Sequence, residues 1–154
     1  MKANRRIRNI ILIVVGGLLI LGLGVMLALP AIFKGFGLHP EYTGQRYLLP
    51  EGRALIIATN HDELGDDGTK TGVFGSELTA PYYEFLGGRM EIDIASIEGG
   101  EIPFDPWSFR RFIESEYDKR YLKDPVLQDK TEDSLPIGEI DFTDYDIIYL
   151  AGGW

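Results

Sequence analysis

The chain contains no cysteine. Disulfide bonds, thiolate metal sites and a cysteine nucleophile are therefore excluded within these 154 residues. We also find no internal repeat and no low-complexity segment. The length suffices for about one domain.

A second absence is local, because residues 10–33 carry no charged side chain. About 20 apolar residues suffice to cross the hydrocarbon of a bilayer. Residues 1–9 hold four basic side chains and no acid. We therefore predict a single-pass membrane protein with a transmembrane anchor at 10–33 and a basic cytoplasmic tail at 1–9. By the positive-inside rule, the α/β portion that follows is predicted to be extracytoplasmic.

Two other interpretations of this apolar segment were weighed. A buried core helix is disfavoured by the length of the segment and by its flanks. A cleaved signal peptide usually has an apolar region of about 7–15 residues and a small-residue cleavage site. Here the run is longer, and "MLALPAIF" has no A-x-A pattern. We therefore favour an uncleaved anchor whose partner is the lipid bilayer. The glycines in it lack the G-x-x-x-G spacing of a helix-packing face.

Positive charge is scarce beyond the tail. All 24 acidic residues lie after residue 9, against 11 of the 15 basic ones, which gives a formal charge of −13 for that part. Such a balance argues against nucleic acid or anionic lipid as a partner of the outer portion.

The remaining sequence alternates between strand and helix patterns. Residues 34–52, rich in glycine, proline and aromatics, are predicted to be a linker. Residues 53–59 form a short apolar run typical of a strand buried on both faces. A second strand, nearer an edge, is predicted at 90–96, and a third with its loop at 146–153.

Helical patterns lie between these strands. Residues 76–88 show helical spacing of apolar side chains, with Ser76 as the expected cap and Pro81 expected in or near the first turn. Residues 109–133 carry helix-like patches broken by Pro125. Alternating strands and helices indicate a doubly wound α/β fold with a parallel sheet.

Three strands are few for such a sheet, which usually has five or more with helices on both faces. The last strand would leave an apolar edge uncovered. We therefore expect residues 53–154 to be the N-terminal part of a larger, here incomplete, α/β domain.

Four stretches together resemble the ThiJ/PfpI family of the class I glutamine amidotransferase-like superfamily, in particular a membrane-anchored bacterial form of its chaperone/glyoxalase-like branch. The resemblance covers roughly residues 50–154. The stretches are "RALIIATNHDELGDDGTKTG", "TGVFGSELTAPYY", "DIASIEGGEIPFDPWS" and "FTDYDIIYLAGGW".

The resemblance implies a flavodoxin-like fold and a cysteine nucleophile followed by histidine. Glu77 matches the family glutamate that contacts this cysteine, and Gly153 matches the glycine whose backbone N–H helps to bind the oxyanion. The chemistry is coherent, since a carboxyl group can share a thiol's proton and a glycine loop lets N–H groups approach an oxyanion. The cysteine should lie some tens of residues beyond Trp154, so we expect this chain alone to be inactive.

Each candidate also has a plainer explanation. Glu77 suits the first turn of a helix, where the dipole favours an acid. The acidic loop at residues 61–68 can bind a divalent cation through oxygen ligands, but it lacks the spacing of an EF-hand. His61 and Glu63 could suggest a zinc site, but no third zinc ligand is evident. A solvated loop is therefore favoured. Trp107 either lines a pocket or packs under its loop, the latter being the default. No metal or cofactor is predicted. The loop acids and their histidine are His61, Asp62, Glu63, Asp66 and Asp67.

Two functional hypotheses remain open, beside a degraded gene product without function. The first is an enzyme part, whose completed domain would act on small carbonyl, glycated or amide substrates. The second is a non-catalytic binding or assembly module, completed by a partner chain or by a homo-oligomer.

Overall fold

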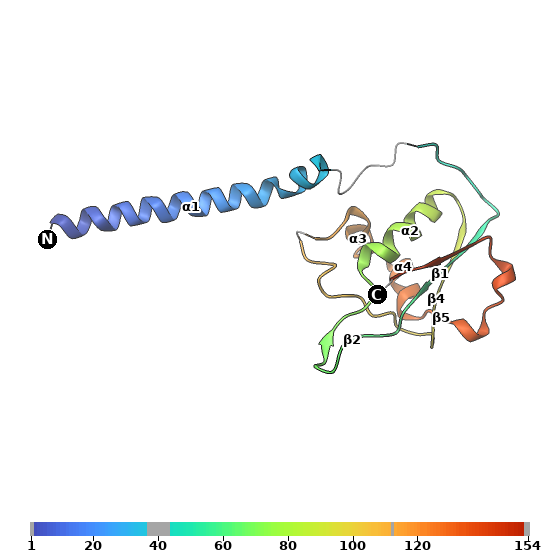
Figure 1. Ribbon diagram of the computed structural model, residues 1–154. Helices are drawn as coiled ribbons and strands as arrows, with labels where there is room; N and C mark the ends of the chain where they lie inside the picture. The colour runs from blue at the N-terminus through green and yellow to red at the C-terminus, as the bar shows by residue number, and fades with distance from the viewer. Residues whose placement is uncertain (1, 37–43, 112, 153–154) are drawn as a thin grey trace. The chain divides into compact units, whose positions relative to one another are not determined.

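The structure is a computed structural model that describes residues 2–36, 44–111 and 113–152. It divides into two units, residues 1–44 and 45–154. The first unit is dominated by helix α1 (Lys2–Gly35), which contains the whole predicted span 10–33 (Figure 1). Its stretch Arg5–Leu29 is long and apolar enough to cross a membrane, a test that a signal sequence also passes.

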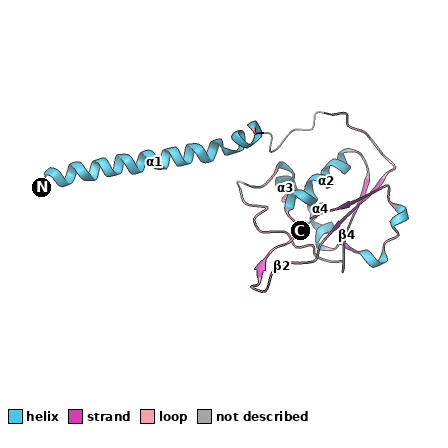
Figure 2. Cartoon of the chain, in the orientation of Figure 1, coloured by secondary structure: helices cyan, strands magenta, loops and turns pink. Residues whose placement is uncertain are grey.

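The second unit is built on a four-stranded parallel sheet with the spatial order β5-β4-β1-β6 (Figures 1 and 2). A separate two-stranded hairpin joins β2 to β3. The bounds of the six strands are β1 Arg53–Ala58, β2 Glu63–Leu64, β3 Thr69–Lys70, β4 Glu91–Ser96, β5 Leu135–Pro136 and β6 Ile147–Leu150.

The three predicted strands are confirmed as β1, β4 and β6, although β1 ends one residue earlier, β4 begins one residue later, and β6 covers only part of the predicted strand and loop. Strand β1 is central, and Leu55 and Ile56 are fully buried. Burial of such side chains contributes roughly 1.5–3 kcal/mol each. The two-residue β5 was not predicted, because a strand this short has no readable alternation.

Three helices of this unit pack on one face of the sheet. They are α2 (Gly75–Gly87), α3 (Glu116–Tyr121) and α4 (Pro125–Glu132). Ile56 and Ile94 are register partners in β1 and β4, so their side chains point to the same face of the sheet. Both belong to one core cluster with Leu78 of α2 and Leu127 of α4. The break predicted at Pro125 is thus the start of α4.

The connection from β5 to β6 crosses the opposite face. It contains two 3₁₀ turns, η1 (Ile137–Glu139) and η2 (Phe142–Asp144). After them, the Tyr145 hydroxyl donates a hydrogen bond to Asp93, which lies on the face opposite Ile94. From β1 to β5, the connecting helices therefore lie on one face of the sheet. The connection from β5 to β6 lies on the opposite face, and it places β6 at the free edge of β1.

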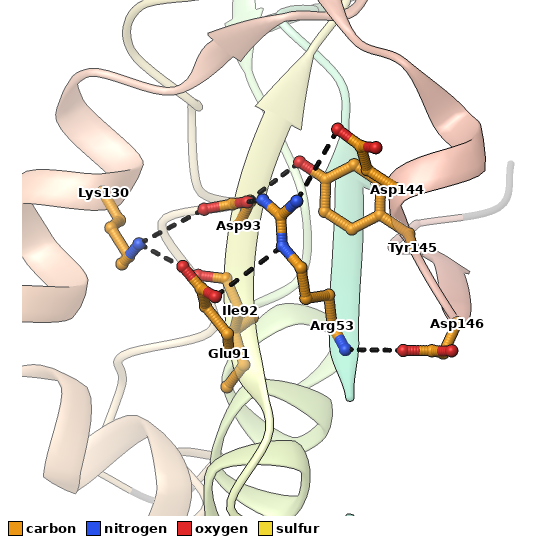
Figure 3. Close-up of polar contacts among 8 residues, drawn as sticks. All are labelled: Arg53, Glu91, Ile92, Asp93, Lys130, Asp144, Tyr145 and Asp146. Carbon is orange, nitrogen blue, oxygen red and sulfur yellow. Dashed lines mark hydrogen bonds and ion pairs between the residues drawn. The ribbon is translucent and has the colours of Figure 1, made fainter. Parts of the chain in front are cut away.

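An ion-pair cluster at the amino ends of the strands holds this crossover (Figure 3). The Arg53 guanidinium lies 2.9 Å from the Asp93 carboxylate and stacks 4.8 Å from the Tyr145 ring centroid. The Arg53 backbone N–H also donates to Asp146, just before β6. Lys130 of α4 approaches Asp93 from the other side, at 3.8 Å.

Two local predictions about α2 were wrong. Its N-cap is Phe74, without a side-chain cap, so Ser76 lies inside the helix. Pro81 also lies inside the helix, beyond its first turn. There it removes one backbone donor, and tertiary packing of the apolar face compensates.

Strand β6 is more exposed than a buried central strand would be. Ile148 is 46% exposed and Leu150 69% exposed. In the part of the chain that the structure describes, β6 is the outermost strand on its side. The expectation of an open apolar edge is confirmed for these residues.

Candidate active site at the carboxyl edge of the sheet

Strand order points to one place on this sheet. Strands β4 and β5 follow β1 outward on one side, whereas β6 lies on the other side of β1. The gap between β1 and β6 is therefore a topological switch point, where the loops leaving the two strands diverge. In open parallel sheets, ligands bind outside the carboxyl ends of the strands at such a point.

Glu77 lies in the segment that leaves β1 for this edge. It is the third residue of α2, in the first turn, and its side chain is half-buried. Its backbone N–H donates to the Phe74 carbonyl at 2.9 Å. Among the described residues the Glu77 carboxylate has no hydrogen-bond or ion-pair partner. It is therefore available to a ligand or to another segment of protein.

The start of α2 is fixed by residues distant in sequence. The Gly75 N–H donates to the Ser108 hydroxyl at 2.8 Å. A Cβ at Gly75 would lie 2.7 Å from a carboxylate oxygen of Asp118, so a larger residue does not fit there without movement. The N–H of the first helical residue is thus satisfied by a remote loop.

Asp118 is the buried acid of this cluster and it is fully engaged. Its carboxylate accepts hydrogen bonds from the Thr79 hydroxyl at 2.8 Å and from the backbone and hydroxyl of Ser115. The Ser115 pair is a capping box that starts α3. Asp118 thus joins α2 to α3, and both of its carboxylate oxygens are engaged in that contact.

The glycine loop after β6 reaches the same edge. The Ala151 N–H donates to the Ile57 carbonyl at 2.8 Å, and Gly152 then adopts φ +88°, which favours glycine. A Cβ at Gly152 would lie 3.9 Å from Val73, two residues before α2. The loop and the start of α2 are therefore neighbours. Gly153 lies outside the described residues, and its oxyanion role remains a prediction.

Asn60 holds the loop after β4 through side-chain hydrogen bonds. The sequence pattern did not identify it as a site residue. Its side-chain NH₂ lies 3.0–3.2 Å from three acceptors, and its side-chain oxygen accepts from the Glu98 N–H at 2.9 Å. The acceptors are Ser96 Oγ, Gly99 O and Glu101 O. Its position directly after a buried strand was the available signal, because polar residues there face the carboxyl edge.

The acidic loop forms the exposed β2–β3 hairpin. The Lys70 ammonium pairs with Asp62 at 2.8 Å and with Glu63 at 3.1 Å. The hydrogen bond from Lys70 holds the pKa of Asp62 below its usual value. Asp67 accepts from the Thr69 N–H in a turn. The described residues contain no group of three or more His, Asp or Glu arranged to hold a metal ion.

Trp107 does not pack under its loop, so the default prediction for it was wrong. Its side chain is 54% exposed, and the Arg110 guanidinium lies 3.5 Å from the centre of its ring. The aromatic packing beneath this loop is supplied by other rings, those of Phe104, Phe109 and Tyr121.

The amino-end cluster around Arg53 is a rival site by charge density, but its two basic side chains are paired with acids of the same cluster. Asp93 faces both Arg53 and Lys130 and accepts from Tyr145 (Figure 3). Burial and this hydrogen bond raise the pKa of Tyr145 to about 12. The cluster therefore joins the crossover to the sheet, whereas the carboxyl edge offers the unpaired acid.

Comparisons with known proteins support the resemblance in part. No family model matches the chain. The chain is 31% identical over 106 residues to the glutathione-independent glyoxalase hsp3101 of Schizosaccharomyces pombe, which covers 67% of this chain and 43% of that protein. It is also similar to two solved structures. One is the Rapid Encystment Protein 24 KDa of Francisella tularensis, with 39% identity, a TM-score of 0.60, and coverage of 66% of this chain and 44% of that one.

The other is glyoxalase III from Candida albicans, with 27% identity, a TM-score of 0.55, and coverage of 63% of this chain and 41% of that one. The chain thus spans less than half the length of these relatives. These relatives are of the glyoxalase III and ThiJ/PfpI type, in agreement with the superfamily that the sequence resembles.

Proposed function

We propose that residues 53–154 form the N-terminal part of a membrane-anchored ThiJ/PfpI-like protein with a flavodoxin-like sheet. The completed domain acts on small carbonyl, glycated or amide substrates through a cysteine nucleophile supplied by protein outside these 154 residues. The observation that carries this proposal is the switch point, where the helix bearing an unpaired Glu77 and the glycine loop after β6 meet at one edge. The names and partial coverage of the relatives support it.

In this proposal Glu77 contacts the incoming thiol and shares its proton, which favours the reactive thiolate. The backbone N–H of Gly153 stabilises the oxyanion formed when the thiolate attacks a carbonyl. The 154-residue chain, which has no cysteine, is inactive by itself.

The first test is to read the coding DNA beyond codon 154. An in-frame continuation that contains an apolar strand followed by a Cys-His pair is the expected result, whereas a genuine stop with no such sequence nearby would reject the enzyme proposal. The longer product is then assayed for glyoxalase and deglycase turnover. Glu77→Gln should abolish turnover, while Glu132→Gln, an exposed acid on α4, should leave it unchanged.

Inactivity of the short chain has its own test. The purified 154-residue protein is assayed in the same way, with and without Glu77→Gln. Robust turnover that disappears in Glu77→Gln would contradict the requirement for a cysteine.

We also propose that residues 10–33 anchor the protein with its N-terminus in the cytoplasm and the α/β portion outside. The support is the apolar stretch within α1 and the basic tail before it. Protease added to spheroplasts should digest the chain beyond residue 34. Full protection would reverse the topology, and a mature mass that lacks the first 30 or so residues would identify a cleaved signal peptide instead.

The exposed edge of β6 favours a second candidate, a non-catalytic assembly module. An unpaired apolar strand can pair with a strand of another chain. In that case the purified chain should form a defined oligomer, and Leu150→Lys should dissociate it. A monomer in light scattering, unchanged by Leu150→Lys, would remove the homo-oligomeric form of this candidate.

A further inference from the structure

Trp107 and Arg110 form a flat, exposed stack, referred to below as the Trp107–Arg110 stack. The guanidinium carbon lies 3.5 Å from the centre of the indole ring. The Arg110 N–H donates to the Trp107 carbonyl at 3.1 Å, so a turn places the two side chains on the same side. Stacking fixes the plane of the guanidinium and leaves its edge of N–H donors free, the geometry that suits a carboxylate.

The loop that carries this stack is attached to the start of α2. The Asp105 N–H donates to the Val73 carbonyl at 3.0 Å. One residue beyond Trp107, the buried Ser108 accepts the first N–H of α2 from Gly75. Because Val73 also adjoins the glycine loop, the loop that carries the stack is attached to the same edge as the candidate active site.

The charge of Arg110 is not neutralised within the described residues. Five basic side chains of this unit lie within ion-pair distance of an acid in the described residues, whereas Arg110, like Arg89, Arg111, Arg120 and Lys123, does not. The five are Arg46, Arg53, Lys70, Lys119 and Lys130. No such contact involves Arg110 in the described part of the chain, although acids outnumber bases 24 to 11 beyond residue 9. The Arg110 guanidinium is therefore available to bind an anion from outside the chain.

We propose that the Trp107–Arg110 stack binds the carboxylate of a small acid that enters or leaves the candidate active site. The guanidinium N–H edge donates to the carboxylate oxygens, and the indole holds the guanidinium in place. The assignment of this acid as substrate or product rests on the proposed function, whereas the binding itself requires no nucleophile and is measurable on the present chain.

The experiment uses the full chain in neutral detergent micelles. Its two indole N–H resonances, from Trp107 and Trp154, are distinguished with Trp154→Phe. Sodium lactate is titrated at constant ionic strength, with lactamide as the neutral match and sodium chloride as the ionic match. The Trp107 resonance should move saturably with lactate and not with lactamide or chloride.

Two neighbouring variants test the assignment. Arg110→Gln should weaken lactate binding about tenfold, since it removes a charge-assisted hydrogen bond. Arg111→Gln removes the adjacent charge without the stack and should change binding less than about twofold. Equal shifts with chloride or lactamide, or binding unchanged in Arg110→Gln, would overturn the proposal. Backbone amide spectra show whether each variant is folded.

These outcomes separate the stack from the proposed function. If this chain binds lactate through Arg110 but the completed protein shows no turnover, the proposed enzyme is rejected and the carboxylate site stands. If turnover depends on Glu77 but lactate does not bind, the stack alone is rejected.

Discussion

At the amino ends of the parallel strands, Arg53 and Asp93 lie 2.9 Å apart, and Tyr145 and Lys130 complete the cluster. At the carboxyl ends, Asn60 holds the loops through neutral hydrogen bonds, and the Glu77 carboxylate has no partner among the described residues. Both ends belong to the same sheet, yet Asp93 at one end is paired, whereas Glu77 near the other has no partner among the described residues.

The difference concerns the acidic side chains, which support the fold at the amino end and are free for chemistry at the carboxyl end. Paired charges in a partly buried cluster hold the β5–β6 crossover in one arrangement. An unpaired acid beside a glycine loop contributes little to stability and is suited to a reacting group. If this distinction is correct, substitutions at the two ends should differ in what they change, and the following predictions test it from the largest expected effect to the smallest.

Asn60→Asp should be the most destabilising of these substitutions. It replaces an NH₂ donor with a carboxylate oxygen that faces three acceptors, Ser96 Oγ and the carbonyls of Gly99 and Glu101. We expect a loss of about 2–4 kcal/mol in the free energy of unfolding at neutral pH. The measurement is urea denaturation of the full chain in micelles, followed by tryptophan fluorescence.

Asn60→Ala is the matched control, because it removes the hydrogen bonds without adding repulsion. It should cost less than Asn60→Asp at neutral pH, and the gap should narrow in acid, where the aspartic acid becomes protonated and donates. An Asn60→Asp protein as stable as wild type would mean that these loop contacts do not hold the carboxyl edge.

Tyr145→Phe should have a moderate effect at the other end. It removes the hydrogen bond to Asp93 and should lower the free energy of unfolding by about 1 kcal/mol at neutral pH. Burial and that bond raise the pKa of Tyr145 to about 12 in the folded state, against about 10 in an unfolded chain.

A raised folded-state pKa gives this effect a definite pH dependence. The stabilisation by Tyr145 is fully present below about pH 10 and is lost as the pH rises through about 12. The stability difference between wild type and Tyr145→Phe should therefore shrink over that range. Burial raises the pKa of Tyr83 in the same direction, so only the difference between the two proteins isolates Tyr145. A constant difference up to the alkaline limit would contradict the assigned hydrogen bond.

The sequence predicted those parts of the fold that depend on local pattern. The apolar run at 53–59 and the alternation at 90–96 predict strands because the order of apolar and polar residues within each segment indicates which side chains are buried. Ser76 was assigned a cap because a serine near a helix start usually is one. The helix instead begins one residue before Ser76, at Gly75, whose N–H donates to Ser108, 33 residues away. No local pattern contains that contact.

The candidate site was predicted differently. Glu77 and Gly153 came from the family resemblance, since an acid in a first turn and a glycine after a strand are common in any α/β protein. The switch point itself depends on which strands pair, and β5 was too short to predict. Asn60 and the Trp107–Arg110 stack depend on loop geometry, which composition does not specify.

Glu77→Gln should change stability least, by less than about 0.5 kcal/mol, because no described side chain loses a partner and only a first-turn dipole interaction weakens. Asp93→Asn is the matched acid-to-amide change at the amino end, and it should cost more because it breaks the ion pair with Arg53. Both are measured by the same urea denaturation. If Glu77→Gln lowers the free energy of unfolding as much as Asp93→Asn does, the Glu77 carboxylate supports the fold. The proposal that it is free to contact a nucleophile from outside these residues would then be contradicted. A stable Glu77→Gln protein beside a weakened Asp93→Asn protein would instead mean that helix α2 carries an acid that the fold does not need.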